Sequence, residues 1–548
     1  MIAWGDRMRQ TTLSVALEVK PESYDHLSSL LDKLREKRNS DPSGGTGPFA
    51  DFLTRVPAVH FMSLSVFPGF DYDPLFVVEA NFDGAPGPFW AQLESAIGPE
   101  LRAMLRCCKR PLDNDGPLFD SITAKDARAP IAPYLERRSL TPTVFHHGNR
   151  GMTRDRILAE HKLFEATRVE LRCANVDGPN PYRVLSPRQI HARLREAVRP
   201  SFTWLDQPAP TRIPLAENIG DWVRLIGFIV AAVFLLSLPG MILSLAMPWE
   251  RYLILLAVLF VGIAMLLKRI GVALPGTAVA TKFSFLKFFF SQLIPLILFV
   301  LGYLAVAVAI GTPLSMLATA RNFDAAWHGM VTWLLWGLAG APVVVAGIVL
   351  WLRVIERRDA SQDAPPVDPV MLREMARRED WIPQNHMGSV VLIKPGILRM
   401  ILIRAGHRGL GLVLRIVARK GYLGSMRTIH FAHWAMVNNK SRLMFFSNFD
   451  QTWESYLDDF IEKAHAGLTL AWCCGVGFPP TRFLVKDGAS HGRQFKEWAR
   501  HSMTVSRFWY SAYKDLTAEQ IERNFRIAIG LRKRTLSDKD AALWINDL

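Results

Sequence analysis

Residues 429–461 read IHFAHWAMVNNKSRLMFFSNFDQTWESYLDDFI, and residues 59–97 read VHFMSLSVFPGFDYDPLFVVEANFDGAPGPFWAQLESAI. Both stretches run from His-Phe through an apolar segment to Asn-Phe-Asp, and then reach an aromatic residue that opens a helix-like pattern. The order and the spacing of these landmarks are nearly the same in the two stretches. They predict an internal repeat, with one copy on each side of a long apolar insert.

Further landmarks extend the match along both flanks. TLSVALEVKP (12–21) and SVVLIKP (389–395) both end in Lys-Pro, and each is followed by a helix-like stretch, 22–38 or 396–419. Later matches are the cysteine pairs Cys107-Cys108 and Cys473-Cys474, and then FHHGNRGMTRDRI (145–157) and WYSAYKDLTAEQI (509–521). The resulting order, strand-helix-strand-strand-helix-strand, is that of a ferredoxin-like unit. One such unit leaves a sheet face uncovered, which a second copy can cover.

The expected fold class is therefore α+β, with two ferredoxin-like repeats that form an intrachain α+β barrel, plus an α-helical transmembrane domain inserted between them in the sequence. This arrangement resembles the dimeric α+β barrel (ferredoxin-like) superfamily, and it is distantly similar to the dye-decolourising haem peroxidases, which are duplicated single-chain members. The resemblance covers the two flanks and is architectural. The haem signature of those peroxidases, Gly-x-x-Asp-Gly, is incomplete in both ANFDG (80–84) and SNFDQ (447–451). The resemblance implies haem as the possible cofactor of an oxidoreductase.

The insert between the flanks is strongly apolar. The sequence has 548 residues, and four segments could span a membrane: 225–249, 252–267, 288–311 and 329–352. A span needs about 20 apolar residues, so the short second segment leaves two spans as the alternative to four. The predicted boundaries are 1–175 for the first repeat, 176–221 for a linker, 222–354 for the membrane helices, 355–384 for a second linker, and 385–548 for the second repeat.

Charge predicts the side of the membrane. The connection between the second and third segments carries basic residues and no acid, and arginines follow the last segment; these residues are Lys268, Arg269, Lys282, Lys287, Arg353, Arg357 and Arg358. Positive charge is retained in the cytoplasm. An even number of spans places both flanks together, so both soluble halves are predicted to be cytoplasmic, at the inner membrane if the source is bacterial.

The candidate catalytic residues are His430, His433, Asp450 and His491, and the candidate cofactor-binding residues are His433, His491 and Trp434. Histidine can act as an acid, a base or an axial haem ligand near neutral pH. His430 has a counterpart in His60, which favours a structural role, whereas His433 and His491 occur only in the second copy. Asp83 and Asp450 follow strands and precede helices. The structural interpretation is that each aspartate caps the helix that follows it by accepting backbone N–H bonds. The cysteines show no metal-ligand spacing, so no metal is expected.

A basic stripe is the strongest local signal. Residues 381–449 contain no Asp or Glu, and Arg404, Arg408, Arg415 and Arg419 fall on one face of a predicted helix. An anionic bilayer attracts such a stripe, and a solvated helix face is the alternative. The net charge is +15, but no nucleic-acid-binding motif accompanies it, so nucleic acid is not expected as a partner.

Two functional classes remain. One is a membrane-anchored oxidoreductase that is related to haem peroxidases and acts on a peroxide or an apolar small molecule. The other is a non-catalytic protein that binds lipid or a partner at the bilayer surface.

Overall fold

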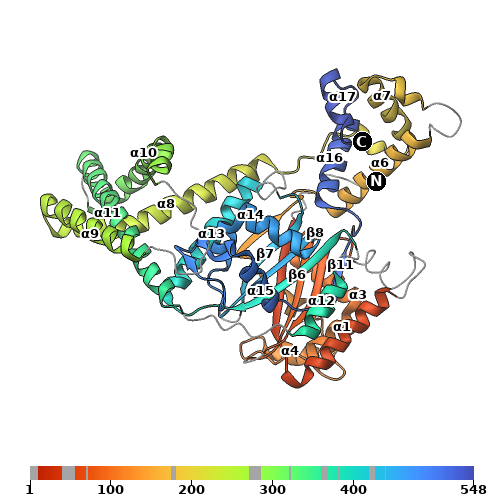
Figure 1. Ribbon diagram of the computed structural model, residues 1–548, viewed down its shortest axis with the longest axis horizontal. Helices are drawn as coiled ribbons and strands as arrows, with labels where there is room; N and C mark the ends of the chain where they lie inside the picture. Colours follow the sequence, from red (N-terminus) through yellow and green to blue (C-terminus); the bar gives the residue numbers. More distant parts are fainter. Residues whose placement is uncertain are drawn as a thin grey trace.

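The structure is a computed structural model that describes residues 10–39, 56–69, 72–173, 180–270, 285–319, 322–359, 368–379, 382–418, 426–437 and 440–548. Within these residues the chain forms a sheet domain, a cluster of helices beside it, and a group of long apolar helices that extends away from it (Figure 1). The fold is a mixture of α-helices and antiparallel sheets.

Two antiparallel sheets form the sheet domain, and each takes an outer strand from the other half of the chain. The first sheet has the order β11-β2-β3-β1-β4 and the second has the order β5-β7-β8-β6. The strands of the first sheet are β1 (Gln10–Glu18), β2 (Val59–Phe67), β3 (Leu75–Asp83), β4 (Ser139–Leu140) and β11 (Phe508–Ser511). The strands of the second sheet are β5 (Val144–His147), β6 (Gln384–Leu392), β7 (Ile429–Val437) and β8 (Arg442–Asp450). A small separate ribbon pairs β9 (Thr481–Arg482) with β10 (Lys486–Asp487).

The two sheets lie face to face. Side chains alternate along each strand, so one face of each sheet packs against the other sheet and the opposite face packs under helices. On β3, Val78 and Phe82 pack under helices, whereas Leu75 and Val77 contact residues of the opposite sheet such as Phe446. Each outer sheet face is covered by the helices of its own half. They are α1 (Tyr24–Asn39), α3 (Pro86–Arg106), α4 (Gly116–Thr123) and α5 (Ala132–Arg138) on the first sheet, and α12 (Pro369–Arg378), α13 (Ile397–Val417), α14 (Trp453–Trp472) and α15 (Gly492–Ser502) on the second.

A cluster of four helices follows the last strands of the two halves and packs around its own apolar core. It contains α6 (Arg154–Cys173), α7 (Pro187–Val198), α16 (Ala518–Arg532) and α17 (Asp538–Ile545), which lie together in Figure 1. The predicted linker 176–221 is therefore not a simple connection, because it contains α7. Ser186 caps α7 in a capping box with Gln189, and this pattern was readable in the sequence.

Four helices in the described part of the chain are long and apolar enough to cross a membrane. They are α8 (Leu215–Ala246), α9 (Trp249–Ile270), α10 (Phe285–Thr319) and α11 (Phe323–Arg357). The second one, predicted to be short, reaches a spanning length because the helix continues through charged residues at both ends, among them Glu250 and Lys268. This result agrees with four spans rather than two. Short 3₁₀ helices, η1 (Pro21–Ser23), η2 (Pro181–Val184), η3 (Thr203–Asp206) and η5 (Gly488–Ser490), complete the structure.

Both ends of this apolar region are attached to the sheet domain. At the first end, Asp221 of α8 accepts from Arg415 of α13 at 3.2 Å. At the other end, the fully buried Arg353 of α11 donates to the carbonyl oxygens of Ile270 at 3.0 Å and Thr481 at 3.1 Å. A buried guanidinium needs such acceptors, so this end of α11 is fixed on the loop that carries β9.

Candidate functional site

Each half of the chain places one histidine at a β-bulge. The pairing of β2 with β3 shifts between Val59 and Phe61, and the pairing of β7 with β8 shifts between Ile429 and Phe431. The extra residue is His60 in the first case and His430 in the second. A bulge re-aims a side chain, and here it turns both imidazoles toward the same end of the sheet domain.

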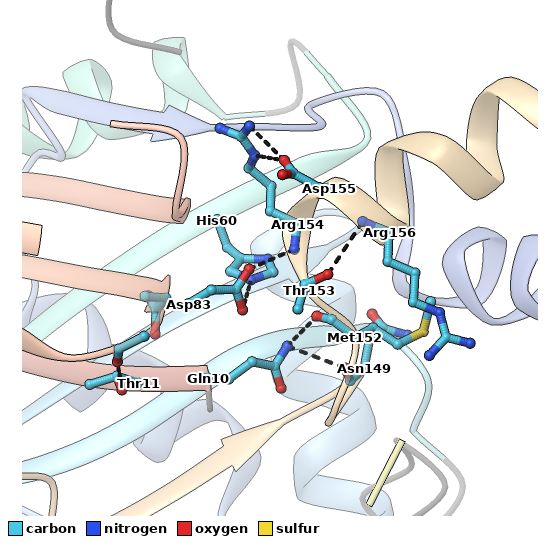
Figure 2. Close-up of polar contacts among 12 residues, drawn as sticks. Gln10, Thr11, His60, Asp83, Asn149, Met152, Thr153, Arg154, Asp155 and Arg156 are labelled. Atoms are coloured by element: carbon cyan, nitrogen blue, oxygen red, sulfur yellow. Dashed lines mark hydrogen bonds and ion pairs between the residues drawn. The ribbon is translucent and has the colours of Figure 1, made fainter. Parts of the chain in front are cut away.

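Each histidine lies against the aspartate that ends the neighbouring strand, with a hydrogen bond in the second half and a contact at ion-pair distance in the first. The Nε2 atom of His430 lies 2.7 Å from Oδ1 of Asp450, and the Nε2 atom of His60 lies 3.0 Å from Oδ1 of Asp83 (Figure 2). The second carboxylate oxygen accepts a backbone N–H, from Ala518 at 2.7 Å for Asp450 and from Arg154 at 2.8 Å for Asp83.

The two aspartates do cap helices, but not the helices expected from the sequence. Ala518 begins α16 and Arg154 begins α6, which are the helices after the last strand of each half. A carboxylate at a helix N-terminus satisfies free N–H groups and interacts favourably with the helix dipole. Each His–Asp pair therefore joins the bulged strand to the helical cluster.

Aromatic side chains enclose the two pairs. His60 and His430 are almost fully buried, and the hydroxyl of Tyr513 lies 2.9 Å from Nδ1 of His60. Phe61 and Phe431 pack against the imidazoles across the centre of the site. Burial raises the pKa of Tyr513 well above its ordinary value, so this phenol stays protonated at neutral pH.

His433 lies deeper, between the two sheets. Its Nε2 atom is 2.8 Å from the hydroxyl of Ser14 in the first sheet, and its ring stacks on Phe446. Burial lowers the pKa of His433 to about 3. The imidazole is therefore neutral at pH 7 and bridges the two sheets by one hydrogen bond.

A buried carboxyl group that was not predicted lies in the same layer. Glu79 points inward from β3 and is fully enclosed, and its Oε1 accepts from the side-chain amides of Asn81 and Asn448. Burial raises the pKa of Glu79 to about 7 and lowers that of His386 to about 3. Between pH 3 and pH 7, the carboxyl group of Glu79 is therefore protonated and the imidazole of His386 is unprotonated, so both are neutral. Glu79 Oε2 lies 3.7 Å from His386 Nε2. In the sequence, Glu79 is the one charged residue before Asp83 in the strand LFVVEANFD, which was the available signal.

The predicted cofactor-binding residues do not meet. Trp434 follows His433 on β7 and so points to the opposite face, where it packs on Phe445 in the core under the helices. His491 is half-buried at the start of α15, on the helix-covered side of the second sheet. The structure brings together only His430 and Asp450 from the predicted catalytic set.

His430 and His433 offer no open coordination position to a haem group. An axial ligand needs an open volume beside an imidazole nitrogen. The Nε2 atoms of His430 and His433 are bonded to protein groups, and their Nδ1 atoms are buried. Neither histidine lines the three cavities whose walls are resolved among the described residues, at β1–β3, among α8, α10 and α11, and between α8 and α13.

A different feature, which we call the basic cavity, opens where α8 meets the sheet domain. It has a volume of about 830 Å³, and its walls come from β1, β5, α8, α13 and the segments that follow β3 and β4. The charged side chains in its wall are Arg224, Arg408 and Arg415, and no acid is among the described residues that line it.

Positive charge exceeds negative charge around this cavity. Asp221, which is almost fully buried, accepts from Arg150 at 2.7 Å, from Arg415 at 3.2 Å and from Arg224 at 3.3 Å. Glu217 also pairs with Arg150, while Arg408 has no charged partner within the described ranges. Four guanidinium groups thus face two carboxylates. His147 adds no charge, because burial lowers its pKa well below the ordinary value.

Helix α13 carries the predicted basic stripe, but the arginines of the stripe differ in their exposure to solvent. Arg404 and Arg408 are exposed, whereas Arg415 is partly buried in the cavity wall over the ring of Phe145. Arg419 lies outside the described residues.

His407 holds α13 in place. Its Nδ1 lies 2.9 Å from the hydroxyl of Thr143, and its Nε2 lies 2.9 Å from the carbonyl oxygen of Ala471. Burial lowers the pKa of His407, and a neutral ring that donates through Nε2 and accepts through Nδ1 matches both partners. Helix α13 is therefore fixed against α14 and against the segment that leads into β5.

Comparisons of the chain with protein-family models, with curated proteins and with solved structures find no match. The function of the site is therefore argued from its geometry and charge.

Proposed function

We propose that this chain is a membrane-anchored protein that binds anionic headgroups of the bilayer in the basic cavity. The observation that carries the proposal is the placement of Arg224, Arg408 and Arg415 in a wall whose described residues include no acid, at the start of a helix of membrane-spanning length. Guanidinium groups are suited to phosphate because they offer paired N–H donors in one plane. The second functional class, a lipid-binding protein, is thus the one we favour.

Exposed apolar residues on the two helices that carry the cavity arginines support contact with a bilayer. Ile397 is 82% exposed and Ile401 is 57% exposed on α13, on the same side as Arg404 and Arg408. Trp222, in the first turns of α8, is also exposed, and tryptophan is enriched at membrane interfaces. Apolar side chains that enter the headgroup region, flanked by arginines, are typical of an interfacial helix.

The architecture that we propose for the sheet domain is a pair of ferredoxin-like repeats that close into one α+β barrel. Three observations support it: the same element order in both halves, the matched bulges, and the exchanged strands. Ser139 and Leu140 pair with β1, and the chain then continues into β5, which pairs with β7. Likewise Met503 bridges to Ser389 of β6 before the chain continues into β11 on β2. These two segments would close the barrel on both sides.

We further propose that both soluble halves lie on the cytoplasmic side. The attachment of α8 and α11 to one sheet domain favours an even number of spans. Arg353 and Arg357 both donate to the carbonyl oxygen of Ile270 at the end of α9, so these positive charges gather on the side of the sheet domain. Positive charge on that side favours the cytoplasm.

Charge reversal at Arg408 tests the headgroup proposal. The full chain would be placed in nanodiscs of phosphatidylcholine with one-fifth phosphatidylglycerol, and the phosphatidylglycerol that stays bound would be counted by native mass spectrometry. We expect Arg408→Glu to lower its retention about thirtyfold, since each basic residue near an anionic lipid contributes about 1 kcal/mol and reversal changes two charges.

Arg404→Glu is the matched control, because Arg404 is equally exposed on α13 but is not in the cavity wall. We expect this control to stay close to the wild-type value. Equal losses in both variants would indicate diffuse attraction to the helix surface, and the cavity would then not be the binding site.

The peroxidase-like alternative has its own test. It requires a Soret absorption band that is lost when His430, His433 or His491 is replaced. We expect no such band in protein supplied with haem, because His430 and His433 are enclosed by protein. A band that disappears in His433→Phe but persists in His26→Phe, a change at an exposed position, would favour the oxidoreductase.

A further inference from the structure

A second cavity, which we call the apolar cavity, lies among α8, α10 and α11. It has a volume of about 1200 Å³, and apolar side chains make up most of its wall. Its residues on α8 recur at steps of three and one, as expected for one face of a helix. They are Val223, Ile226, Gly227, Val230, Ala231 and Phe234, and Leu245 also lines the cavity further along α8.

Adjacent residues in the first turns of α8 line the two cavities. Val223 lines the apolar cavity and the next residue, Arg224, lines the basic cavity. Consecutive helix residues point about 100° apart, so the cavities open on neighbouring sides of the same turn. Phe228, one turn further along, packs beside Gly409 of α13 and ties this turn to the helix that carries Arg408.

We infer that the two cavities hold one molecule, an anionic lipid whose headgroup lies against Arg224 and Arg408 and whose acyl chain follows the apolar stripe of α8. This inference rests on the proposed function and specifies its ligand. A volume of about 1200 Å³ exceeds that of a typical small-molecule pocket. An occupant of this size between helices of membrane-spanning length has to be as apolar as a lipid chain.

Glycines keep the apolar cavity open. A Cβ atom added at Gly227 of α8, or at Gly329 of α11, would meet no atom within 4 Å. A large side chain at either position would therefore enter the cavity rather than collide with a neighbouring helix. Gly262 of α9 has the same free surroundings but does not line the apolar cavity, which makes it a matched control position.

Photo-crosslinking tests the inference on the full chain in phosphatidylcholine nanodiscs. The probe is phosphatidylglycerol with a diazirine at the end of one acyl chain, and a phosphatidylcholine with the same chain is the reference probe. We expect the anionic probe to label peptides of α8, α10 and α11 at least about fivefold more than the reference probe. Gly227→Trp and Gly329→Leu should each remove most of this labelling, and Gly262→Trp should preserve it.

Arg408→Glu separates the inference from the proposed function. If one lipid bridges both cavities, this variant lowers both headgroup retention and chain labelling about thirtyfold. Loss of retention with unchanged chain labelling would overturn the inference and leave the proposed function in place. If neither quantity depends on Arg408, both fail. Equal labelling by the two probes would also overturn the inference, because the apolar cavity would then hold any bulk lipid.

Discussion

Replacement of Asp450 by alanine is expected to lower the free energy of unfolding by about 3–5 kcal/mol. The carboxylate is buried and accepts from His430 Nε2 and from the backbone N–H of Ala518. Alanine leaves both donors enclosed without an acceptor, while Thr517 remains the N-cap of α16. Urea unfolding of the detergent-solubilised chain, followed by tryptophan fluorescence, would measure the change.

Two variants make this measurement specific. Asp450→Asn keeps an oxygen for the N–H of Ala518 and is expected to lose less than half as much as alanine. Asp458→Ala removes a carboxylate that is 64% exposed and pairs with Lys496, and an exposed ion pair contributes less than about 1 kcal/mol. If Asp450→Ala is as stable as Asp458→Ala, the His–Asp pair does not join the strand to the helix.

The equivalent change in the first half, Asp83→Ala, is expected to have a similar effect. Asp83 has the same two kinds of partner, His60 and the N–H that begins α6. Similar losses in the free energy of unfolding for Asp83→Ala and Asp450→Ala would support the duplicated architecture in solution. A much smaller effect at Asp83 would show that only the second half depends on its His–Asp pair.

Local sequence patterns were enough to place many secondary elements. The apolar runs that contain His60 and His430 form β2 and β7, and the helix predicted at 396–419 is α13 at Ile397–Val417. The strand predicted at 389–395 actually begins at Gln384. The prediction missed this start because the first residues, QNH, are polar and give no apolar signal. Alternation and helical periodicity are local properties, so they can be read from one sequence.

The partners of these elements could not be read in the same way. The sequence contains no signal that β5 joins the sheet of the second half, since that choice depends on contacts across nearly three hundred residues, such as Phe145 with His433. The bulge at His430 shifts the register by one residue and changes the face that its side chain meets, which simple alternation does not predict. The walls of the basic cavity come from α8, α13 and β5, which are far apart in the sequence. The stripe on α13 could therefore be predicted from the sequence, but the cavity could not.

The second large effect is expected from Glu79→Gln, and it depends on pH. The folded-state pKa of Glu79 is raised from 4.5 to about 7 by burial. The folded protein therefore keeps a proton that the unfolded chain releases between these values, so this group's contribution to stability is lost as the pH rises through the window. Glutamine removes the ionisation but preserves an oxygen for the amides of Asn81 and Asn448.

We expect Glu79→Gln and the wild type to be equally stable near pH 4.5. The variant should then gain stability progressively, to about 3 kcal/mol near pH 7, and keep that gain at higher pH. Urea unfolding at pH 4.5, 6, 7 and 8.5 would measure the difference. Glu497→Gln, at an exposed position, should show no gain at any of these pH values.

The difference in the free energy of unfolding between Glu79→Gln and the wild type contains the contribution of Glu79 but not that of the buried histidines. His386 and His433 have folded pKa values of about 3, so their contribution to stability is lost as the pH falls below their ordinary value of 6.5, in both proteins alike. The opposite outcome has a clear meaning. If Glu79→Gln destabilises the protein at pH 6–7, then Glu79 is ionised and paired with a charged His386. The layer between the sheets would then hold an ion pair, and replacing His386 by glutamine would destabilise the protein as well.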